Sequence, residues 1–345
     1  MSFNRIVRLT ITVASISVIA AGIVNFLPTP VTESGVSPVV TRNSLTGLPG
    51  TDGPILVVKI DDTAPAHPQI GLSEADVVYI EQVEGGLTRL AALYSSTIPE
   101  LVGPVRSARI SDIELLSQFG KVGFAFSGAQ RKFLPVIAAA NLFDVGAMRY
   151  GPQYYANDPQ RVAPYAMMLK SKDLLSKAQE NGASFAPSKS AGWNFGKPAT
   201  NLKKITSARV TWPANSYDIS WSESENRWLL SHNGQPNLDS TGYHLGPKTF
   251  VVQIVSITDS IYSDKVGGIT PLSKTVGSGE CYILRNGGYV RAKWSRPTEA
   301  DGTTFTNFKG EELTFDRGQI WFALSSNIPT FAEVAAQDAP VKANK

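Results

Sequence analysis

The stretch VVYIEQVEGGLTRLAALYSSTIPELVGPVRSAR (residues 77–109) contains two apolar runs that are typical of buried strands, joined by Glu84-Gly85-Gly86. This Glu-Gly-Gly step favours a tight hairpin, because glycine adopts the positive φ angles that short turns require. Charged side chains nevertheless occupy positions where packing alone would favour valine or leucine: Glu81, Glu84, Arg89, Arg106 and Arg109. Buried charge is costly unless it is paired or holds a ligand, so this stretch is also where we expect a functional site.

Helical and strand patterns alternate on either side of this hairpin. The elements predicted before residue 200 are strands at 55–60, 75–84, 87–96 and 121–128, and helices at 111–120, 131–140 and 171–182. Pro135 lies near the start of the second helix or kinks it. This order predicts a mixed α/β domain over residues 54–199.

The pattern changes near Thr200 to alternating or β-branched runs bounded by Gly, Asn and Pro. Asn286-Gly287 between two alternating runs is a strong hairpin signal. We therefore predict an α+β chain in which a mostly antiparallel β domain (200–328) follows the α/β domain. The last residues, 329–345, are polar and are predicted to form a flexible tail.

The N-terminus has the pattern of a membrane segment. Arg5 and Arg8 precede an apolar run, and no acidic residue occurs before Glu33. This predicts an uncleaved single-pass anchor (1–27) in the cell membrane and a Pro/Ser/Gly-rich tether (28–53). The rest of the chain is predicted to lie on the extracytoplasmic side. Cleavage of the segment as a signal peptide is the alternative, and it would release a secreted protein.

The composition excludes several functional classes. The net charge is only +3 and no basic run with interleaved aromatic residues occurs, so we expect no nucleic-acid partner. The three histidines and the single cysteine are far apart in sequence and show no zinc-ligand spacing.

The arginines of GPVRSAR (103–109), directly before a predicted helix, suggest an anion site. We predict that Arg89, Arg106 and Arg109 form this site, and that Glu81, Glu84 and Asp61 support it. The alternative is that these arginines pair internally with Glu81, Glu84, Asp61 or Asp112, and the sequence leaves both open.

Two further patterns bear on catalysis. Asp61 and Asp62 end a predicted strand and, with Glu81 or Glu84, are weak candidates for a magnesium site, but an ordinary turn explains them better. Ser127 lacks the G-x-S-x-G spacing of a nucleophile elbow and is predicted to cap a helix instead. We therefore predict no cofactor and no resident metal.

Four segments resemble the YerB-like family of bacterial envelope proteins, which carry a domain of unknown function numbered 3048 and are often lipoproteins. They are TGLPG (46–50), PQIGLSEADVVYIEQVEGGLTR (68–89), GPVRSAR and GQIWFAL (318–324). The resemblance spans about residues 43–327 and implies export and surface attachment, without an established reaction. The chain departs from the family pattern at Asp62, at 126–129 and at 164–166, where relatives carry asparagine or histidine. Loss of these histidines favours binding over catalysis.

These observations lead to two functional hypotheses. The first is a membrane-anchored binding or scaffolding protein whose partner is an envelope polymer, a lipid-linked precursor or another envelope protein. The second is a magnesium-dependent phosphotransferase or hydrolase acting on a phosphorylated, polyprenyl-linked envelope precursor. The predicted layout of the chain, a membrane anchor followed by a tether and an α/β domain with arginines on strands and loops, is similar to that of the LytR-CpsA-Psr phosphotransferases. The sequence favours the first hypothesis because it contains no identifiable nucleophile–base pair, although an enzyme also remains compatible with it.

Overall fold

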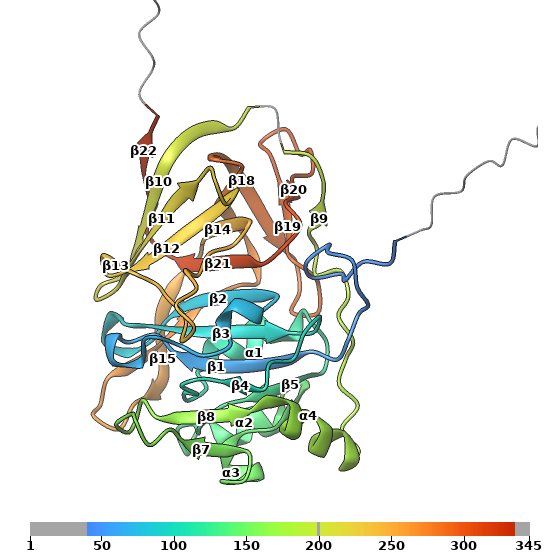
Figure 1. Ribbon diagram of the computed structural model, residues 1–345, viewed down its shortest axis with the longest axis vertical. Helices are drawn as coiled ribbons and strands as arrows, with labels where there is room; N and C mark the ends of the chain where they lie inside the picture. The colour runs from blue at the N-terminus through green and yellow to red at the C-terminus, as the bar shows by residue number, and fades with distance from the viewer. Residues whose placement is uncertain (1–39, 199–200, 335–345) are drawn as a thin grey trace, which may run out of the picture. The chain divides into compact units, whose positions relative to one another are not determined.

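The computed structural model describes residues 40–198 and 201–334 (Figure 1). The predicted membrane segment and residues 335–345 of the predicted tail lie outside the described residues. Within the described part of the chain, no helix is long and apolar enough to span a bilayer.

Most of the described residues that form regular structure belong to one large mixed sheet. In spatial order its strands are β13 (Gln235–Pro236), β12 (Arg227–His232), β11 (Ser216–Ser222), β10 (Lys203–Thr211), β18 (Gly288–Arg296), β17 (Gly277–Arg285), β14 (Thr249–Ile254), β21 (Ile320–Ser325), β2 (Val77–Gln82), β3 (Thr88–Tyr94), β1 (Leu56–Asp61), β5 (Val122–Ala125) and β6 (Leu142–Asp144), with β19 (Thr304–Thr306) beside β18 and β22 (Thr330–Glu333) beside β10. The described chain is therefore β-rich with a large mixed sheet, and the predicted α+β organisation with a mixed α/β domain over residues 54–199 stays a prediction.

The remaining elements are short. The small sheets are β15 (Ile257–Ser263) with β16 (Ile269–Ser273), β20 (Thr314–Phe315) with β9 (Asn194–Phe195), and β4 (Leu101–Val102) with β8 (Met167–Lys170) and β7 (Tyr155–Asn157). The α-helices are α1 (Ile110–Ser117), α2 (Leu134–Ala139), α3 (Ala147–Tyr150) and α4 (Ser171–Glu180). The 3-10 helices are Ala64–Ala66, Leu72–Glu74 and Glu84–Gly86.

Strand β21, near the end of the chain, joins the early and late parts of the sequence. It runs parallel to β2 on one side and to β14 on the other, so that Ile320 is opposite both Val77 and Thr249. Figure 1 shows β21, coloured red, between the blue strand β2 and the orange strand β14. The boundary predicted near residue 200 divides the sequence, whereas the sheet continues across it.

Both predicted hairpins are confirmed. Strands β2 and β3 are antiparallel neighbours, and Gly85 (φ 68°) and Gly86 (φ 71°) turn the chain between them. Strands β17 and β18 are joined by Asn286 (φ 50°) and Gly287 (φ 65°), the two positive φ angles of a type I′ turn.

The central strands separate two hydrophobic cores, because successive side chains of a strand point to opposite faces. Val58 and Ile60 of β1 belong to the core that contains Tyr217 of β11. Val57 of the same strand belongs to the second core, with Leu115 of α1. The hydrophobic residues of α1 therefore cover one face of the sheet, and residues of β11 pack on the other.

Three local predictions differ from the structure. Ser127 does not cap a helix, because α2 begins seven residues later, and its backbone N–H donates to the Arg106 carbonyl (3.0 Å). Within the predicted tether, Asn43 and Leu45 are buried, and the Leu45 carbonyl accepts a hydrogen bond from Trp193 (3.3 Å). Within the predicted tail, Thr330–Glu333 forms β22 and pairs with β10.

Candidate functional site

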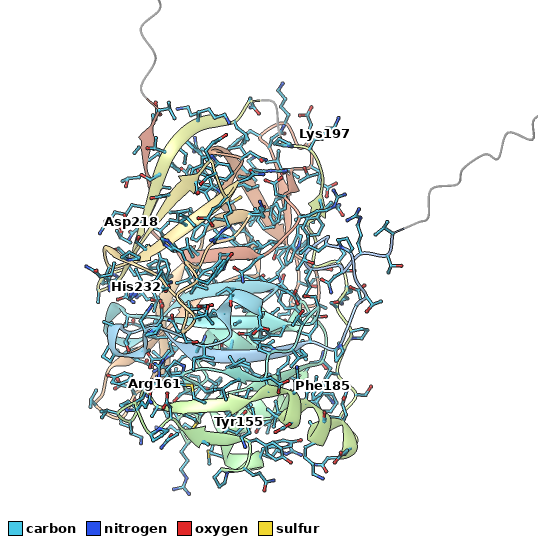
Figure 2. The ribbon with its side chains drawn as sticks, viewed as in Figure 1. Tyr155, Arg161, Phe185, Lys197, Asp218 and His232 are labelled. Carbon is cyan, nitrogen blue, oxygen red and sulfur yellow. The ribbon has the colours of Figure 1, made fainter. Side chains whose placement is uncertain are left out.

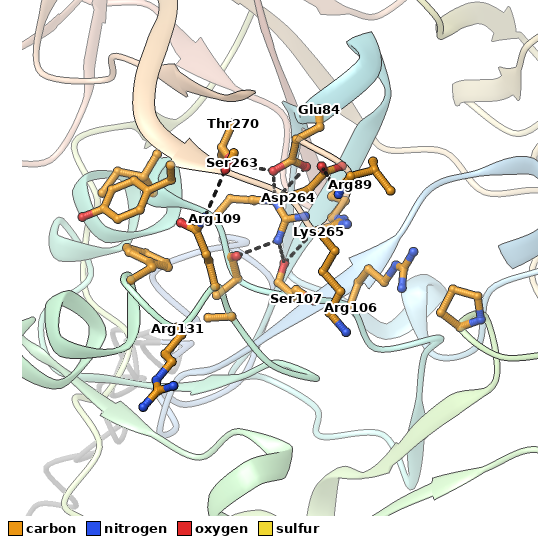
Figure 3. A pocket seen from close by; sticks show the side chains of 18 residues that line it. Glu84, Arg89, Arg106, Ser107, Arg109, Arg131, Ser263, Asp264, Lys265 and Thr270 are labelled. Atoms are coloured by element: carbon orange, nitrogen blue, oxygen red, sulfur yellow. Dashed lines mark hydrogen bonds and ion pairs between the residues drawn. The ribbon is translucent and has the colours of Figure 1, made fainter. Parts of the chain in front are cut away.

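The three arginines that were predicted to form an anion site all line one cleft of about 800 Å³ (Figure 3). Arg89 enters it from β3, whereas Arg106 and Arg109 come from the loop between β4 and α1. Further along the wall lie the charged side chains of Arg131, Lys265, Glu84 and Asp264. Five cationic and two anionic side chains therefore line the cleft, which gives it a positive charge.

Arg109 forms an ion pair with Glu84, which agrees with the alternative that the arginines pair internally with carboxylates. Its Nε atom lies 2.7 Å from Glu84 Oε1, and its Nη1 donates to the Ala108 carbonyl (2.9 Å). Thr270 also donates a hydrogen bond to Glu84. Burial alone would raise the pKa of Glu84, but Arg109 and Thr270 outweigh burial and lower it, so this carboxylate is anionic.

Arg106 is held by Asp61 in a similar way. The Arg106 Nε and Asp61 Oδ2 atoms are 2.5 Å apart, and Arg106 remains 21% exposed. Asp61 also accepts hydrogen bonds from the backbone (2.8 Å) and the hydroxyl (2.6 Å) of Thr63. The carboxylate thus fixes Arg106 at the cleft while the guanidinium keeps access to solvent.

Arg89 has no such partner. It is only 8% exposed, and among the residues that the structure describes no carboxylate oxygen lies within 4.0 Å of its guanidinium. Its Nη1 donates to the Ser107 carbonyl (2.9 Å). Burial, and then the positive charges of Arg109 and Arg106, lower the pKa of Arg89 from 12.5 to about 9. Arg89 is therefore a buried cation next to two other cations.

At the start of α1, one backbone amide is already bound by a side chain. The Asp112 carboxylate reaches back and accepts a hydrogen bond from the Arg109 backbone N–H (2.6 Å). This contact satisfies the Arg109 amide alone, and anion binding by the first amides of α1 stays a prediction.

Glu81 is also not a support for the arginines. It is opposite Arg89 in the sheet register, but its Oε1 lies 2.6 Å from Lys59 Nζ, and Lys59 Nζ lies 2.7 Å from Asp112 Oδ1. All three side chains are buried. Burial, and then the Asp112 charge, raise the pKa of Glu81 to about 8 although Lys59 opposes the shift. The group is a buried charge cluster that contacts the cleft residue Arg109 through Asp112.

We expect this raised pKa to make stability depend on pH. The folded protein holds the Glu81 proton up to about pH 8, whereas the unfolded chain releases it near its ordinary pKa of 4.5. The free energy of unfolding should therefore fall as pH rises from about 5 to 8, by about 1.4 kcal/mol for each unit of pKa difference. Glu81→Gln should reduce this slope in urea titrations at pH 5, 6.5 and 8. Glu280→Gln, at a partly exposed ion pair with Arg291, is the control, and equal slopes in wild type and Glu81→Gln would contradict the assignment.

Asp62 follows Asp61 directly but belongs to a different cluster. Its Oδ1 lies 3.4 Å from His67 Nε2 and its Oδ2 lies 3.8 Å from His232 Nε2. The two imidazole rings stack, with their centres 4.5 Å apart. No spacing motif in the sequence points to this cluster, because His67 and His232 are 165 positions apart.

Two hydroxyl groups orient the Asp62 carboxylate. Tyr217 donates to Oδ1 (2.7 Å) and Thr88 donates to Oδ2 (2.5 Å). Burial alone would raise the pKa of Asp62, but the histidines and Thr88 outweigh it and lower the pKa. Burial lowers the pKa of His232 despite the nearby Asp62. The cluster therefore combines an anionic carboxylate with an imidazole that favours its neutral form.

Comparisons with known proteins agree with this fold. The solved structure of YerB from Bacillus subtilis superimposes with a TM-score of 0.72, covering 85% of this chain and all of that chain at 21% sequence identity. In sequence, the protein named "Putative lipoprotein YerB" of the same organism is 44% identical over 69 residues, and this alignment spans about a fifth of each chain.

Two family models match the chain. Residues 45–184 match the N-terminal domain, and residues 208–322 the C-terminal domain, of the family described as "Protein of unknown function (DUF3048)". The resemblance inferred from the four sequence segments is thereby confirmed: this chain belongs to the DUF3048 family.

Proposed function

We propose that this protein is an extracytoplasmic, membrane-associated protein of the cell envelope that binds a phosphate-bearing ligand in its arginine-lined cleft. Its role is binding or scaffolding. The relative described as a lipoprotein supports attachment to a membrane surface, and the predicted N-terminal segment would provide a single-pass anchor. The partner is an envelope polymer, a lipid-linked precursor or an envelope protein that carries phosphate.

The unpaired charge of Arg89 is the observation that carries this proposal. A buried guanidinium without a carboxylate partner is costly, and two neighbouring guanidiniums increase the cost. A phosphate placed among Arg89, Arg106 and Arg109 would offset this repulsion and accept charge-assisted hydrogen bonds. Arg109 and Arg106 are already oriented by Glu84 and Asp61, as expected for a preorganised site.

The cleft offers more than a phosphate site. Its volume of about 800 Å³ lies within the usual range for small-molecule sites. Ile110, Phe133 and Tyr262 add apolar and aromatic surface to the wall. This combination suits a phosphorylated compound with an apolar part, such as a polyprenyl phosphate.

The magnesium-dependent alternative finds less support in the contacts of its proposed ligands. Asp61 pairs with Arg106, and Glu81 pairs with Lys59. Asp62 accepts hydrogen bonds from Tyr217 and Thr88 on the other face of the sheet. The three carboxylates therefore do not converge on one ion, and these contacts favour binding over phosphoryl transfer.

Replacing Arg89 by methionine tests the proposal, because the variant removes the unpaired charge and leaves the other ion pairs in place. We expect the affinity for a polyprenyl phosphate, and for inorganic pyrophosphate, to fall by about 10- to 150-fold, equivalent to about 1.5–3 kcal/mol. The folded protein should keep its stability, because no carboxylate loses its partner. Isothermal titration calorimetry and thermal melts measure the two effects.

Arg209→Met is the matched control, since Arg209 forms a partly exposed ion pair with Asp218 on strands away from the cleft. It should bind both probes as the wild type does. Absence of binding by the wild type, or equal binding by Arg89→Met, would refute the anion site.

A further inference from the structure

The Asp62 cluster brings three metal-ligating side chains together from distant parts of the chain. Asp62 and His67 flank the 3-10 helix after β1, and His232 ends β12. Figure 2 labels His232 where the yellow strands meet the blue ones. The ligand atoms of the three residues all lie within 4.8 Å of one another. We infer that Asp62, His67 and His232 bind one divalent transition-metal ion, for which Zn²⁺ is the best-suited occupant.

The distances fit coordination better than direct hydrogen bonding. The Asp62 oxygens lie 3.4 and 3.8 Å from the two Nε2 atoms, beyond the 2.7–3.2 Å typical of N–H···O bonds. Two ligand atoms on one tetrahedral zinc ion, each with a bond of about 2.0–2.1 Å, are about 3.3 Å apart. The Asp62–His67 separation of 3.4 Å matches this spacing, and the Asp62–His232 separation of 3.8 Å is about 0.5 Å longer, so a small movement of His232 would complete the site.

The surroundings of the carboxylate match those of a metal ligand. Each Asp62 oxygen accepts one short hydrogen bond from a hydroxyl group, Tyr217 on Oδ1 and Thr88 on Oδ2. A carboxylate oxygen has a second lone pair, which remains for a metal. Such outer hydrogen bonds fix the orientation of ligating side chains. Two imidazoles and one carboxylate are a donor set typical of zinc and of neighbouring transition metals.

Gln69 supplies a second observation at the same place. It is fully buried, and its Oε1 atom has no hydrogen-bond partner among the described residues. Its Nε2 atom lies 3.2 Å from His67 Nε2 and 3.4 Å from Asp62 Oδ1. The same Nε2 atom donates to the Asp61 carbonyl (3.3 Å), so Gln69 holds the loop after β1 beside the three candidate ligands.

This site is separate from the arginine-lined cleft. Asp61 is opposite Arg89 in the sheet and pairs with Arg106 at the cleft, whereas Asp62 contacts Tyr217 in the opposite core. A metal ion would link the loop after β1 to β12. His67 is 18% exposed, which gives the ion a route from solvent.

Zinc binding by the purified, untagged full chain tests this inference, after treatment with a chelator and dialysis. Competition with a chromophoric chelator should show one Zn²⁺ per chain, and Co²⁺ should give the visible absorption of a tetrahedral site. His67→Gln and His232→Gln retain a hydrogen-bond donor but lose the imidazole ligand. Each should lower zinc affinity by more than about 100-fold, since altering only an outer-shell partner already costs 10- to 100-fold.

The third histidine provides the matched control. His244 contacts the Leu230 carbonyl and is not part of the cluster, so His244→Gln should bind zinc as the wild type does. Zinc should also raise the melting temperature of the wild type and of His244→Gln, but not that of the other two variants. If His232→Gln fails to fold, the partly exposed His67 decides the result. No stoichiometric binding, or equal binding by His67→Gln, would show that the cluster is a hydrogen-bond network only.

Discussion

A chain that ends at Arg317 is expected to show no cooperative unfolding transition, because it lacks β21. All six residues of this strand are buried, and the strand hydrogen-bonds to β2 and β14. Trp321 packs in one core and Phe322 in the other. Each large apolar side chain contributes about 1.5–3 kcal/mol by burial, so four of them (Ile320, Trp321, Phe322 and Leu324) approach the whole stability of a typical domain, about 5–15 kcal/mol.

Circular dichroism and urea titration of the truncated chain measure this loss. A chain that ends at Val334 is the matched control, since it keeps β21 and β22, and it should unfold as the wild type does. The fragment 40–199 should also fail to fold, because β2 would have an open edge where β21 binds. A cooperative transition in this fragment would instead show that the domain predicted up to residue 199 is an independent folding unit.

The features that the sequence predicted well are local in the chain. Glu84-Gly85-Gly86 and Asn286-Gly287 specify their hairpins through the φ angles of two adjacent residues. The helix predicted from Ser111 to Gly120 appears as α1, because the helix signals also lie within one short segment. The three arginines reach one cleft because strand β3 and the loop before α1 are close in sequence.

The features that the sequence missed depend on long-range contacts. An apolar run such as residues 320–325 predicts a buried strand, but it does not show that the strand pairs with β2, more than 240 residues earlier. Glu81 was assigned to the arginines because its neighbour in the hairpin is Arg89, whereas Lys59 on another strand binds its carboxylate. His67 and His232 are brought together only by the packing of β12 against the loop after β1.

Lys59→Met should lower the free energy of unfolding by about 3–5 kcal/mol at pH 8, because it leaves buried carboxylates without their cation. The Lys59 ammonium group is completely buried between Glu81 Oε1 (2.6 Å) and Asp112 Oδ1 (2.7 Å). Methionine has a similar length and keeps the packing of the side chain, so the change removes charge rather than volume. At pH 5 the loss should be smaller, since Glu81 then carries a proton in the folded state and is no longer an unpaired anion.

Urea titrations of Lys59→Met at the two pH values measure the effect, and two variants provide the comparison. Lys172→Met removes an exposed ion pair with Glu100 and should cost less than about 1 kcal/mol at either pH. The double variant Lys59→Met/Glu81→Gln should be more stable than Lys59→Met at pH 8, because only Asp112 then lacks the cation and its other oxygen still accepts the Arg109 N–H. If the double variant is no more stable than the single one, Glu81 is not the carboxylate that Lys59 neutralises. The buried cluster would then contribute to stability by packing.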